Sequence, residues 1–245
     1  MIVALSSVTR EGYLYRVDLR LRPNGKNGPL VTSSEGFLDY VKQRSAIWEW
    51  LAYVKLRAVA GDLELGRMIE THARHAIHEK ARAINPDELK QETRRVRERL
   101  ESEKGRSIAK DKRRVSRGGR DDIDIKYSAG GMLDVYFATR HLQLSDDVAD
   151  EGENRSTLAT LRRLETNGSL ETCDYDALSQ GYELLRAVDH HLRLIVGKVS
   201  ALPGTDYPAF KEISRRLDFV SPAKLSETLR ERMRAIREAY DRITT

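Results

Sequence analysis

The segment that decides the fold is residues 178–195, which read LSQGYELLRAVDHHLRLI. Its apolar side chains recur every three or four positions, which is the spacing of one face of an α-helix. They are Leu178, Tyr182, Leu185, Val188, Leu192 and Ile195. The segment therefore predicts a long amphipathic helix that packs its apolar face against other helices.

The same spacing extends in both directions from this segment, from residue 156 to the last residues of the sequence. One set of leucines marks a helix before the segment, and two further sets mark the last two helices. These positions are Leu158, Leu161, Leu164, Ile213, Leu217, Leu225, Leu229, Met233, Ile236 and Tyr240. We therefore expect residues 146–245 to form a helical bundle, reached through an acidic linker at residues 146–155.

Helical signals also dominate the first half of the sequence. A capping-box pattern, Thr32 with Glu35, predicts a helix that ends near Gly61. A second helix is expected over residues 63–83. Proline is favoured in the first turn of a helix, so a third, highly charged helix is expected over residues 86–105.

Residues 13–22 are the clearest predicted strand, because apolar and charged side chains alternate with a period of two. A glycine-rich turn follows it, and residues 30–31 can begin a return strand, which would complete a hairpin. Residues 123–127 are a candidate for a further strand of this β element, and residues 132–144 are expected to form a helix. The sequence thus predicts a mostly α protein with a small antiparallel β element.

Composition excludes several classes of protein. A single cysteine, Cys173, excludes an internal disulfide framework and a cysteine-based zinc site. No apolar run approaches the ~18 residues of a membrane span. These features favour a cytoplasmic protein, because a reducing cytosol is the simplest compartment for it.

The basic residues point to acidic partners. The net charge is +5, and residues 104–120 contain eight Lys and Arg against one acid, Asp111. A basic balance favours nucleotides, nucleic acid or an acidic protein face. This stretch has no aromatic residue to stack on bases and no surrounding nucleic-acid motif, so a solvated loop is favoured over a nucleic-acid site.

The predicted strand carries the first candidate site. Asp18 lies between Arg16 and Arg20 on one face, with Arg22 beyond. Arginine forks match phosphate oxygens, and a carboxylate can hold a divalent cation. Lys26 in the following turn can reach a phosphate as well. A metal–polyphosphate site and a surface row of ion pairs both stay open.

A second candidate lies where residues 123–127 meet the following helix. Asp122 and Asp124 are two positions apart, which would place both carboxylates on one face of a strand. Gly130 and Gly131 then precede the helix, and amides at a helix N-terminus attract anions. A tight connection that needs glycine for its backbone geometry is the alternative reading.

Several of these segments together resemble one family. Residues 11–30, EGYLYRVDLRLRPNGKNGPL, look like the signature of the glutamine synthetase adenylyltransferases (glutamate–ammonia ligase adenylyltransferases). The similarity continues in order along nearly the whole sequence. Its further blocks are Trp48-Glu49, KLRAVAGD at residues 55–62, Asp124-Ile125-Lys126 with Gly130, Gly131 and Asp134, residues 184–186, residues 191–194 and Leu202-Pro203.

The resemblance implies a nucleotidyltransferase fold followed by a helical bundle, with residues 1–145 as a remnant of the first and residues 146–245 as the second. It implies transfer of AMP from ATP to a tyrosine of glutamine synthetase, or its removal, with Mg²⁺ or Mn²⁺ on the phosphates. A PII-type signal protein is the implied regulator. Asp18 corresponds to a catalytic, metal-binding carboxylate. The implied nucleotide-binding residues are Arg16, Arg20, Arg22, Lys26, Arg57, Lys126, Gly130 and Gly131.

The sequence departs from the family pattern in two places. The family carries a Gly-Ser pair and two closely spaced aspartates before the Asp18 block, and no aspartate precedes Asp18 here. Tyr136 stands where the family usually has glutamate. We therefore expect a truncated nucleotidyltransferase domain without adenylyltransferase activity of its own. A catalytically inactive, protein-binding helical module and a basic RNA-binding helical protein are the alternatives.

Overall fold

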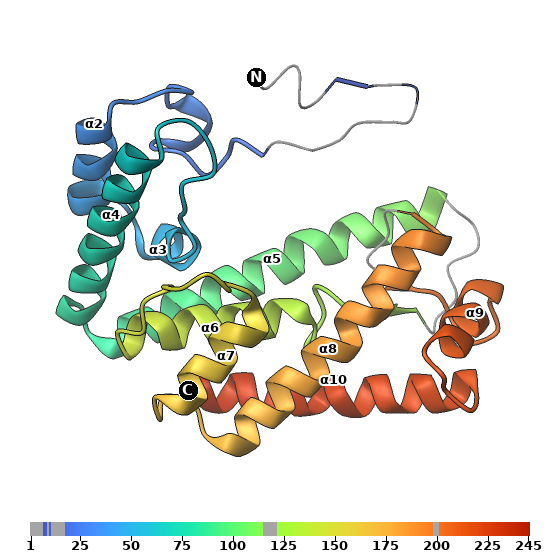
Figure 1. Ribbon diagram of the computed structural model, residues 1–245. Coiled ribbons are helices and arrows are strands. Elements are labelled where there is room, and N and C mark those ends of the chain that lie inside the picture. Colours follow the sequence, from blue (N-terminus) through green and yellow to red (C-terminus); the bar gives the residue numbers. More distant parts are fainter. Residues whose placement is uncertain (1–6, 9, 11–17, 115–121, 198–200) are drawn as a thin grey trace. The chain divides into compact units, whose positions relative to one another are not determined.

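Helices make up most of the chain, which confirms the predicted fold class (Figure 1). The computed structural model describes residues 7–8, 10, 18–114, 122–197 and 201–245. The chain divides into two units, Met1–Ile77 and His78–Thr245. The predicted change of domain at residue 145 rests on the family resemblance and stays a prediction.

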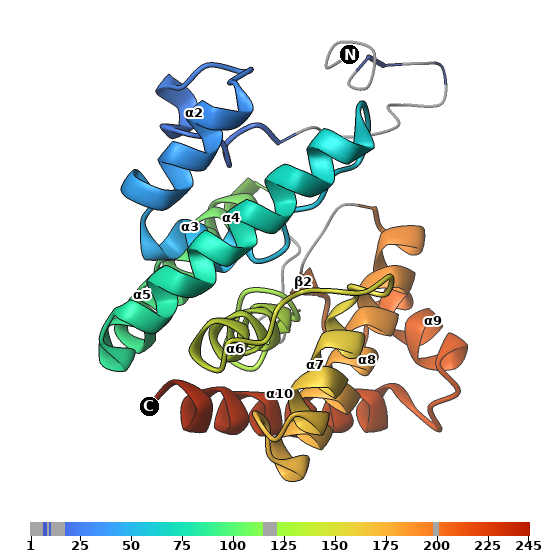
Figure 2. The same ribbon diagram turned by 60° about the vertical axis from the view of Figure 1, so that its left-hand side comes forward.

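The first unit contains α2 (Ser34–Asp39), a π-helical turn η2 (Tyr40–Arg44), α3 (Ile47–Tyr53) and the beginning of α4 (Leu63–Ala83) (Figure 2). The capping box predicts one helix here, and that prediction is wrong because the chain leaves the helix at Ser45. The Ser45 hydroxyl donates to the Val41 carbonyl at 2.6 Å. Ser33, rather than Thr32, caps α2 by accepting from the Gly36 amide at 3.1 Å.

A buried glutamate stabilises this interruption. The hydroxyl of Tyr40 donates to Glu49 Oε1 at 2.7 Å, and the amide of Ala46 donates to Glu49 Oε2 at 2.9 Å. The second bond satisfies an amide at the N-terminus of α3. The Glu49 side chain thus links η2, through Tyr40, to the start of α3, through Ala46.

The predicted hairpin is not formed by residues 18–33. These residues run as loop, interrupted by the short 3₁₀ turn η1 (Gly25–Asn27), and residues 13–17 lie outside the described part. Leu21, Leu30 and Val31 are 55%, 62% and 85% exposed. Alternation favours a strand only where one face is covered, and these apolar side chains remain in contact with water.

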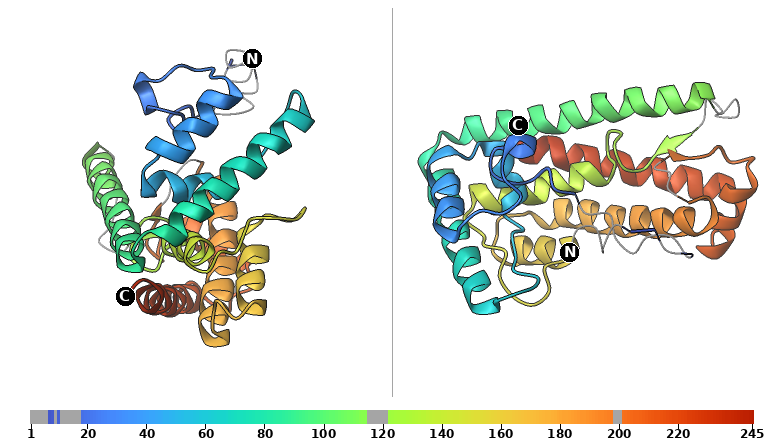
Figure 3. Two further views of the ribbon diagram at one scale, coloured as in Figure 1. Left: turned by 90° about the vertical axis from the view of Figure 1, so that its left-hand side faces the viewer. Right: turned by 90° about the horizontal axis from the view of Figure 1, so that it is seen from above.

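The second unit is a helical bundle built around its last helix. Its helices are α5 (Pro86–Arg114), α6 (Met132–Ser145), α7 (Thr157–Thr166), α8 (Thr172–Ile195), α9 (Pro208–Arg216) and α10 (Pro222–Thr244). Helix α10 contacts α5, α6, α8 and α9, and α7 packs on α6 and α8 (Figure 3). Leu178, Leu185, Val188 and Leu192 of the predicted stripe are buried in this core, together with leucines of α7 and α10. Tyr182 is only half-buried and Ile195 is 36% exposed, so these two positions of the predicted stripe lie outside the core.

Two local predictions in this unit need correction. Helix α5 continues to Arg114, so residues 105–114 are helical rather than a loop. The small antiparallel sheet joins β1 (Ile123–Asp124) to β2 (Ala201–Leu202). It therefore connects the residues before α6 to those after α8, and the 123–127 segment does not pair with residues 18–33.

Ion pairs hold the acidic linker in place. Asp147 accepts from Arg82 at 2.6 Å and lies 2.9 Å from the ring nitrogen Nδ1 of His78. Asp150 is buried and accepts from Arg163 of α7 at 2.9 Å. The acids of residues 146–155 thus attach the segment to neighbouring helices of the second unit.

Among the described residues, no helix has the length and apolar character that a membrane crossing needs.

Candidate functional site

Asp18 and Arg20 form a two-bond ion pair at the surface of the first unit. Arg20 donates from Nε to Asp18 Oδ1 at 2.9 Å and from Nη2 to Oδ2 at 2.6 Å. The backbone amide of Arg20 also donates to Oδ1, at 3.0 Å. These side-chain and backbone hydrogen bonds lower the pKa of Asp18 to about 2, so the carboxylate is ionised at neutral pH.

The other predicted residues of this block have separate roles. Arg22 donates to the carbonyls of Leu19, Gly28 and Lys26, at 2.5, 3.1 and 3.1 Å, and thereby closes the loop that carries them. The side chains of Lys26 and Arg57 are exposed, and Arg16 lies outside the described residues. The structure therefore places Asp18, Arg20 and Lys26 on one surface loop.

A complete metal centre does not form around Asp18 in the described part of the chain. No group of three or more His, Cys, Asp or Glu side chains close enough to hold a metal occurs there. Both Asp18 oxygens are also engaged by Arg20. A two-metal site needs several carboxylates, so the described residues do not by themselves fit a pair of magnesium ions.

The residues after β1 build a tight turn in the second unit. Asp124 Oδ1 accepts from the amides of Lys126 and Tyr127, at 2.9 and 3.0 Å, so this carboxylate orders the turn. Gly130 has a φ of +74°, and a Cβ at this position would lie 1.8 Å from the Met233 carbonyl oxygen. Gly131 is buried beside the Lys126 and Ser128 carbonyls. Both glycines serve close packing of this loop.

A buried ion pair follows this turn. Asp134 of α6 pairs with Arg97 of α5, and the two side chains are 0% and 1% exposed. The amide of Gly130 donates to Asp134 Oδ2 at 2.7 Å, and Arg237 of α10 lies 3.6 Å from the same oxygen. Asp134 thus joins α5, α6 and α10 beneath the loop that carries Lys126.

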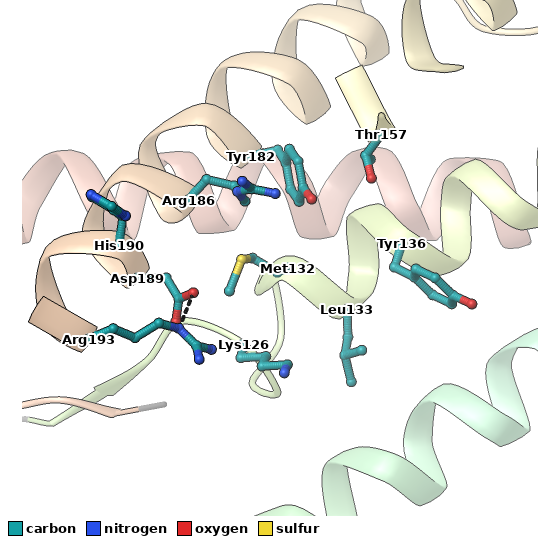
Figure 4. A pocket seen from close by; sticks show the side chains of 10 residues that line it. All are labelled: Lys126, Met132, Leu133, Tyr136, Thr157, Tyr182, Arg186, Asp189, His190 and Arg193. Carbon is teal, nitrogen blue, oxygen red and sulfur yellow. Dashed lines mark hydrogen bonds and ion pairs between the residues drawn. The ribbon is translucent and has the colours of Figure 1, made fainter. Parts of the chain in front are cut away.

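A pocket of about 420 Å³ opens beside this loop, between α6, α8 and the first residue of α7 (Figure 4). Helix α8 supplies Tyr182, Arg186, Asp189, His190 and Arg193. The opposite wall consists of Lys126, Met132, Leu133, Tyr136 and Thr157. Among the predicted nucleotide-binding residues that the structure describes, only Lys126 lines this pocket.

Three cations and one carboxylate set the charge of the pocket. Arg193 donates from Nε to Asp189 Oδ2 at 2.8 Å, and this hydrogen bond raises the pKa of Arg193. The guanidinium of Arg186 lies 5.9 Å from the centre of the Tyr182 ring, and Lys126 Nζ lies 5.3 Å from that of Tyr127. Within the described chain, no ion pair engages Arg186 or Lys126, so the pocket retains a positive charge.

The sequence contained a signal for this pocket that the prediction did not use. Tyr182, Arg186, Asp189 and Arg193 recur at three- and four-residue steps, and they form a second face of the same helix whose apolar stripe decided the fold. Charged side chains on such a face usually indicate solvent exposure. The partner wall, including Tyr136, comes from another helix and is not visible in the local pattern.

Comparisons with known proteins give two family matches and two similar enzymes. A family model described as glutamate-ammonia ligase adenylyltransferase matches residues 1–72, and one described as GlnD PII-uridylyltransferase matches residues 94–244. The bifunctional glutamine synthetase adenylyltransferase/adenylyl-removing enzyme of Pseudomonas aeruginosa is 29% identical over 231 residues, which are 94% of this chain and 22% of that protein. The enzyme of the same name from Hahella chejuensis is 31% identical over 194 residues, 79% of this chain and 19% of that protein.

Both family models describe nucleotidyltransferases. The larger match covers more than half of the chain, so the chain belongs to the family of the GlnD PII-uridylyltransferase model. Its first 72 residues match the glutamate-ammonia ligase adenylyltransferase model, and both relatives are named as glutamine synthetase adenylyltransferases. The family predicted from the sequence is confirmed. The chain spans about a fifth of the length of the curated relatives that it matches.

Proposed function

We propose that this chain is part of an enzyme that transfers AMP from ATP to glutamine synthetase or removes it, and so regulates nitrogen assimilation in the cytoplasm. The observation that carries the proposal is the similarity to the Pseudomonas aeruginosa enzyme over 94% of the chain. The two family matches also follow one another along the chain, over residues 1–72 and 94–244.

In this proposal the loop around Asp18 contributes to a magnesium–ATP site. Its carboxylate is ionised, and Arg20, Arg22 and Lys26 lie on the same loop. Charge-assisted bonds from such side chains favour phosphate oxygens. Glutamine synthetase is the proposed protein partner, and a PII-type signal protein is the proposed regulator, which the description of the larger family match supports.

A helical protein-binding module without catalysis is the second candidate. The pairing of both Asp18 oxygens with Arg20 favours it, because a metal ion would have to compete with that guanidinium. The two candidates share glutamine synthetase as a partner and differ in the binding of magnesium–ATP. They therefore predict different outcomes of one pair of measurements.

The test combines glutamine synthetase binding with calorimetry of ATP in the presence and absence of magnesium. We expect the chain to bind glutamine synthetase, and magnesium to strengthen ATP binding in a way that Asp18→Asn abolishes. Binding to glutamine synthetase without this magnesium effect would favour the non-catalytic module. Absence of glutamine synthetase binding would contradict both candidates.

Labelled AMP transfer from ATP to glutamine synthetase then tests catalysis directly. We expect little transfer by this chain alone, because no group of three or more potential metal ligands forms around Asp18 in the described part, and two metal ions need several carboxylates. Loss of such ligands costs on the order of 10³-fold in rate. Robust magnesium-dependent labelling would contradict this expectation, and Asp122 would then be the next carboxylate to replace.

A further inference from the structure

We propose that the pocket between α6 and α8 is a binding site for a nucleoside phosphate, and that it works without a metal ion. The inference deepens the proposed function, because it gives the second unit a nucleotide site of its own. All residues that line the pocket belong to the second unit, whereas Asp18 belongs to the first.

The cations of the pocket select an anion. Lys126, Arg186 and Arg193 face one carboxylate, Asp189, which is already bonded to Arg193. No ion pair satisfies Lys126 or Arg186 within the described residues, so both can donate to a phosphate. Such charge-assisted bonds are shorter and stronger than neutral ones.

Side chains, rather than backbone amides, must provide this recognition. The pocket lies at the N-terminus of α6, where amides are often free to bind anions. Here the Met132 amide donates to the Ile125 carbonyl at 3.0 Å, and the Leu133 amide donates to the Lys126 carbonyl at 3.1 Å. The first amides of α6 are therefore already bonded to carbonyls of the chain. A phosphate in this pocket would be bound mainly by the side chains of Lys126 and Arg186.

Asp189 acts as a positioning residue for Arg193. Its side chain is 16% exposed, and it holds the Arg193 guanidinium through Nε at 2.8 Å (Figure 4). Nη1 and Nη2 are the ends that such an arginine presents to a ligand. An arginine fixed in this way loses less side-chain entropy when it binds a phosphate.

The remaining walls suit a nucleoside rather than a bare phosphate. Tyr136, Tyr182, Met132 and Leu133 give the pocket two aromatic rings and two apolar side chains next to the cations. Aromatic rings stack on bases of any sequence. A volume of about 420 Å³ lies in the usual range of small-molecule sites.

Calorimetry of the full chain with AMP, in the presence of EDTA, tests the proposal. We expect AMP to bind, and Arg186→Gln and Lys126→Gln each to weaken it about tenfold or more, because each removes a hydrogen bond to a charged group. Arg230→Gln is the matched control: Arg230 is an exposed arginine of α10 that does not line the pocket, and its variant should bind AMP as the wild type does. Thermal melting of each variant verifies that it is folded.

Pyrophosphate and Tyr182→Leu test the nucleoside part of the proposal. We expect AMP to bind more tightly than pyrophosphate, and Tyr182→Leu to remove that preference while pyrophosphate binding persists. Equal binding of AMP by the Arg186→Gln and Arg230→Gln variants would overturn the site. Loss of AMP binding in EDTA through Asp18→Asn would also overturn it, whereas loss of only the magnesium effect concerns the proposed function.

Discussion

Two aspartate–arginine pairs of the same chemistry lie in very different surroundings. Asp18 and Arg20 in the first unit have 57% and 74% of their side chains exposed. Asp134 and Arg97 in the second unit are 0% and 1% exposed. Water solvates the first pair, whereas the charges of the second are compensated by protein groups alone. Burial, rather than pairing, thus separates a carboxylate that a ligand can reach from one that holds helices together.

The largest expected effect is that of breaking the buried pair. Asp134→Asn leaves the Arg97 guanidinium in the core with only Glu101 as its charged partner, and Glu101 is 41% exposed. We expect the free energy of unfolding to fall by about 3 kcal/mol or more, because a buried charge loses its compensation. Urea unfolding, followed by circular dichroism, measures this loss.

Asp241→Asn is the matched control for that prediction. Asp241 accepts from Arg237 at 2.9 Å within the same group of side chains, and it is 41% exposed. Its replacement should cost less than about 1 kcal/mol. If the free energy of unfolding fell equally in the Asp134→Asn and Asp241→Asn variants, burial would not be what makes the Asp134 pair important for stability.

An intermediate effect is expected from acid, through His141 of α6. Burial, together with the charge of Lys90, lowers the pKa of His141 from 6.5 to about 4. The unfolded chain therefore binds a proton at a higher pH than the folded chain does, so stability falls as the pH drops from 6.5 towards 4. At about 1.4 kcal/mol per pKa unit, this loss is about 3 kcal/mol at most.

Unfolding in urea at pH 7 and pH 4.5 measures this effect, with His141→Gln as the comparison. The variant has no imidazole to protonate, so its stability should fall less between the two pH values than that of the wild type. Identical acid sensitivity of the two proteins would mean that His141 is protonated in the folded state. Asp18 of the exposed pair contributes little to the change in stability between pH 7 and pH 4.5, because its pKa is about 2.

The smallest expected effect is that of Asp18→Asn on stability. The carboxylate and its arginine are both solvated, so we expect a change in the free energy of unfolding below about 1 kcal/mol. Urea unfolding at pH 7 measures it in parallel with the magnesium–ATP experiment. A loss as large as that of Asp134→Asn would remove the distinction between the two pairs.

Periodicity predicted the helices well because their apolar faces are buried where the pattern requires. The second helix was expected over residues 63–83, and α4 has these limits. In α8, four of the six predicted apolar positions are buried, Leu178, Leu185, Val188 and Leu192. The pattern missed the break at Ser45, which the buried side chain of Glu49 stabilises. It indicated a strand at Ile123 but could not show that the partner of this strand is Leu202.

The candidate site was only partly predictable for the same reason. Lys126 was named from the family resemblance, and the pocket around it needs Arg186 and Arg193 from a helix much later in the sequence. For Gly130 the sequence left open a ligand contact and a tight connection that needs glycine, and the φ of +74° beside the Met233 carbonyl of α10 agrees with the second. Sequence shows which side chains share a helix face, but not which other helix that face meets.

The pairing of Ile123 with Leu202 has a consequence for the order of folding of the second unit. These two residues are separated by all of α6, α7 and α8, so joining them early would close a long loop at a high entropic cost. Local helices form first, and contacts between distant segments follow. We therefore expect the two strands to meet only after α6 and α8 have packed, and the wall that carries Lys126 to be completed late in folding.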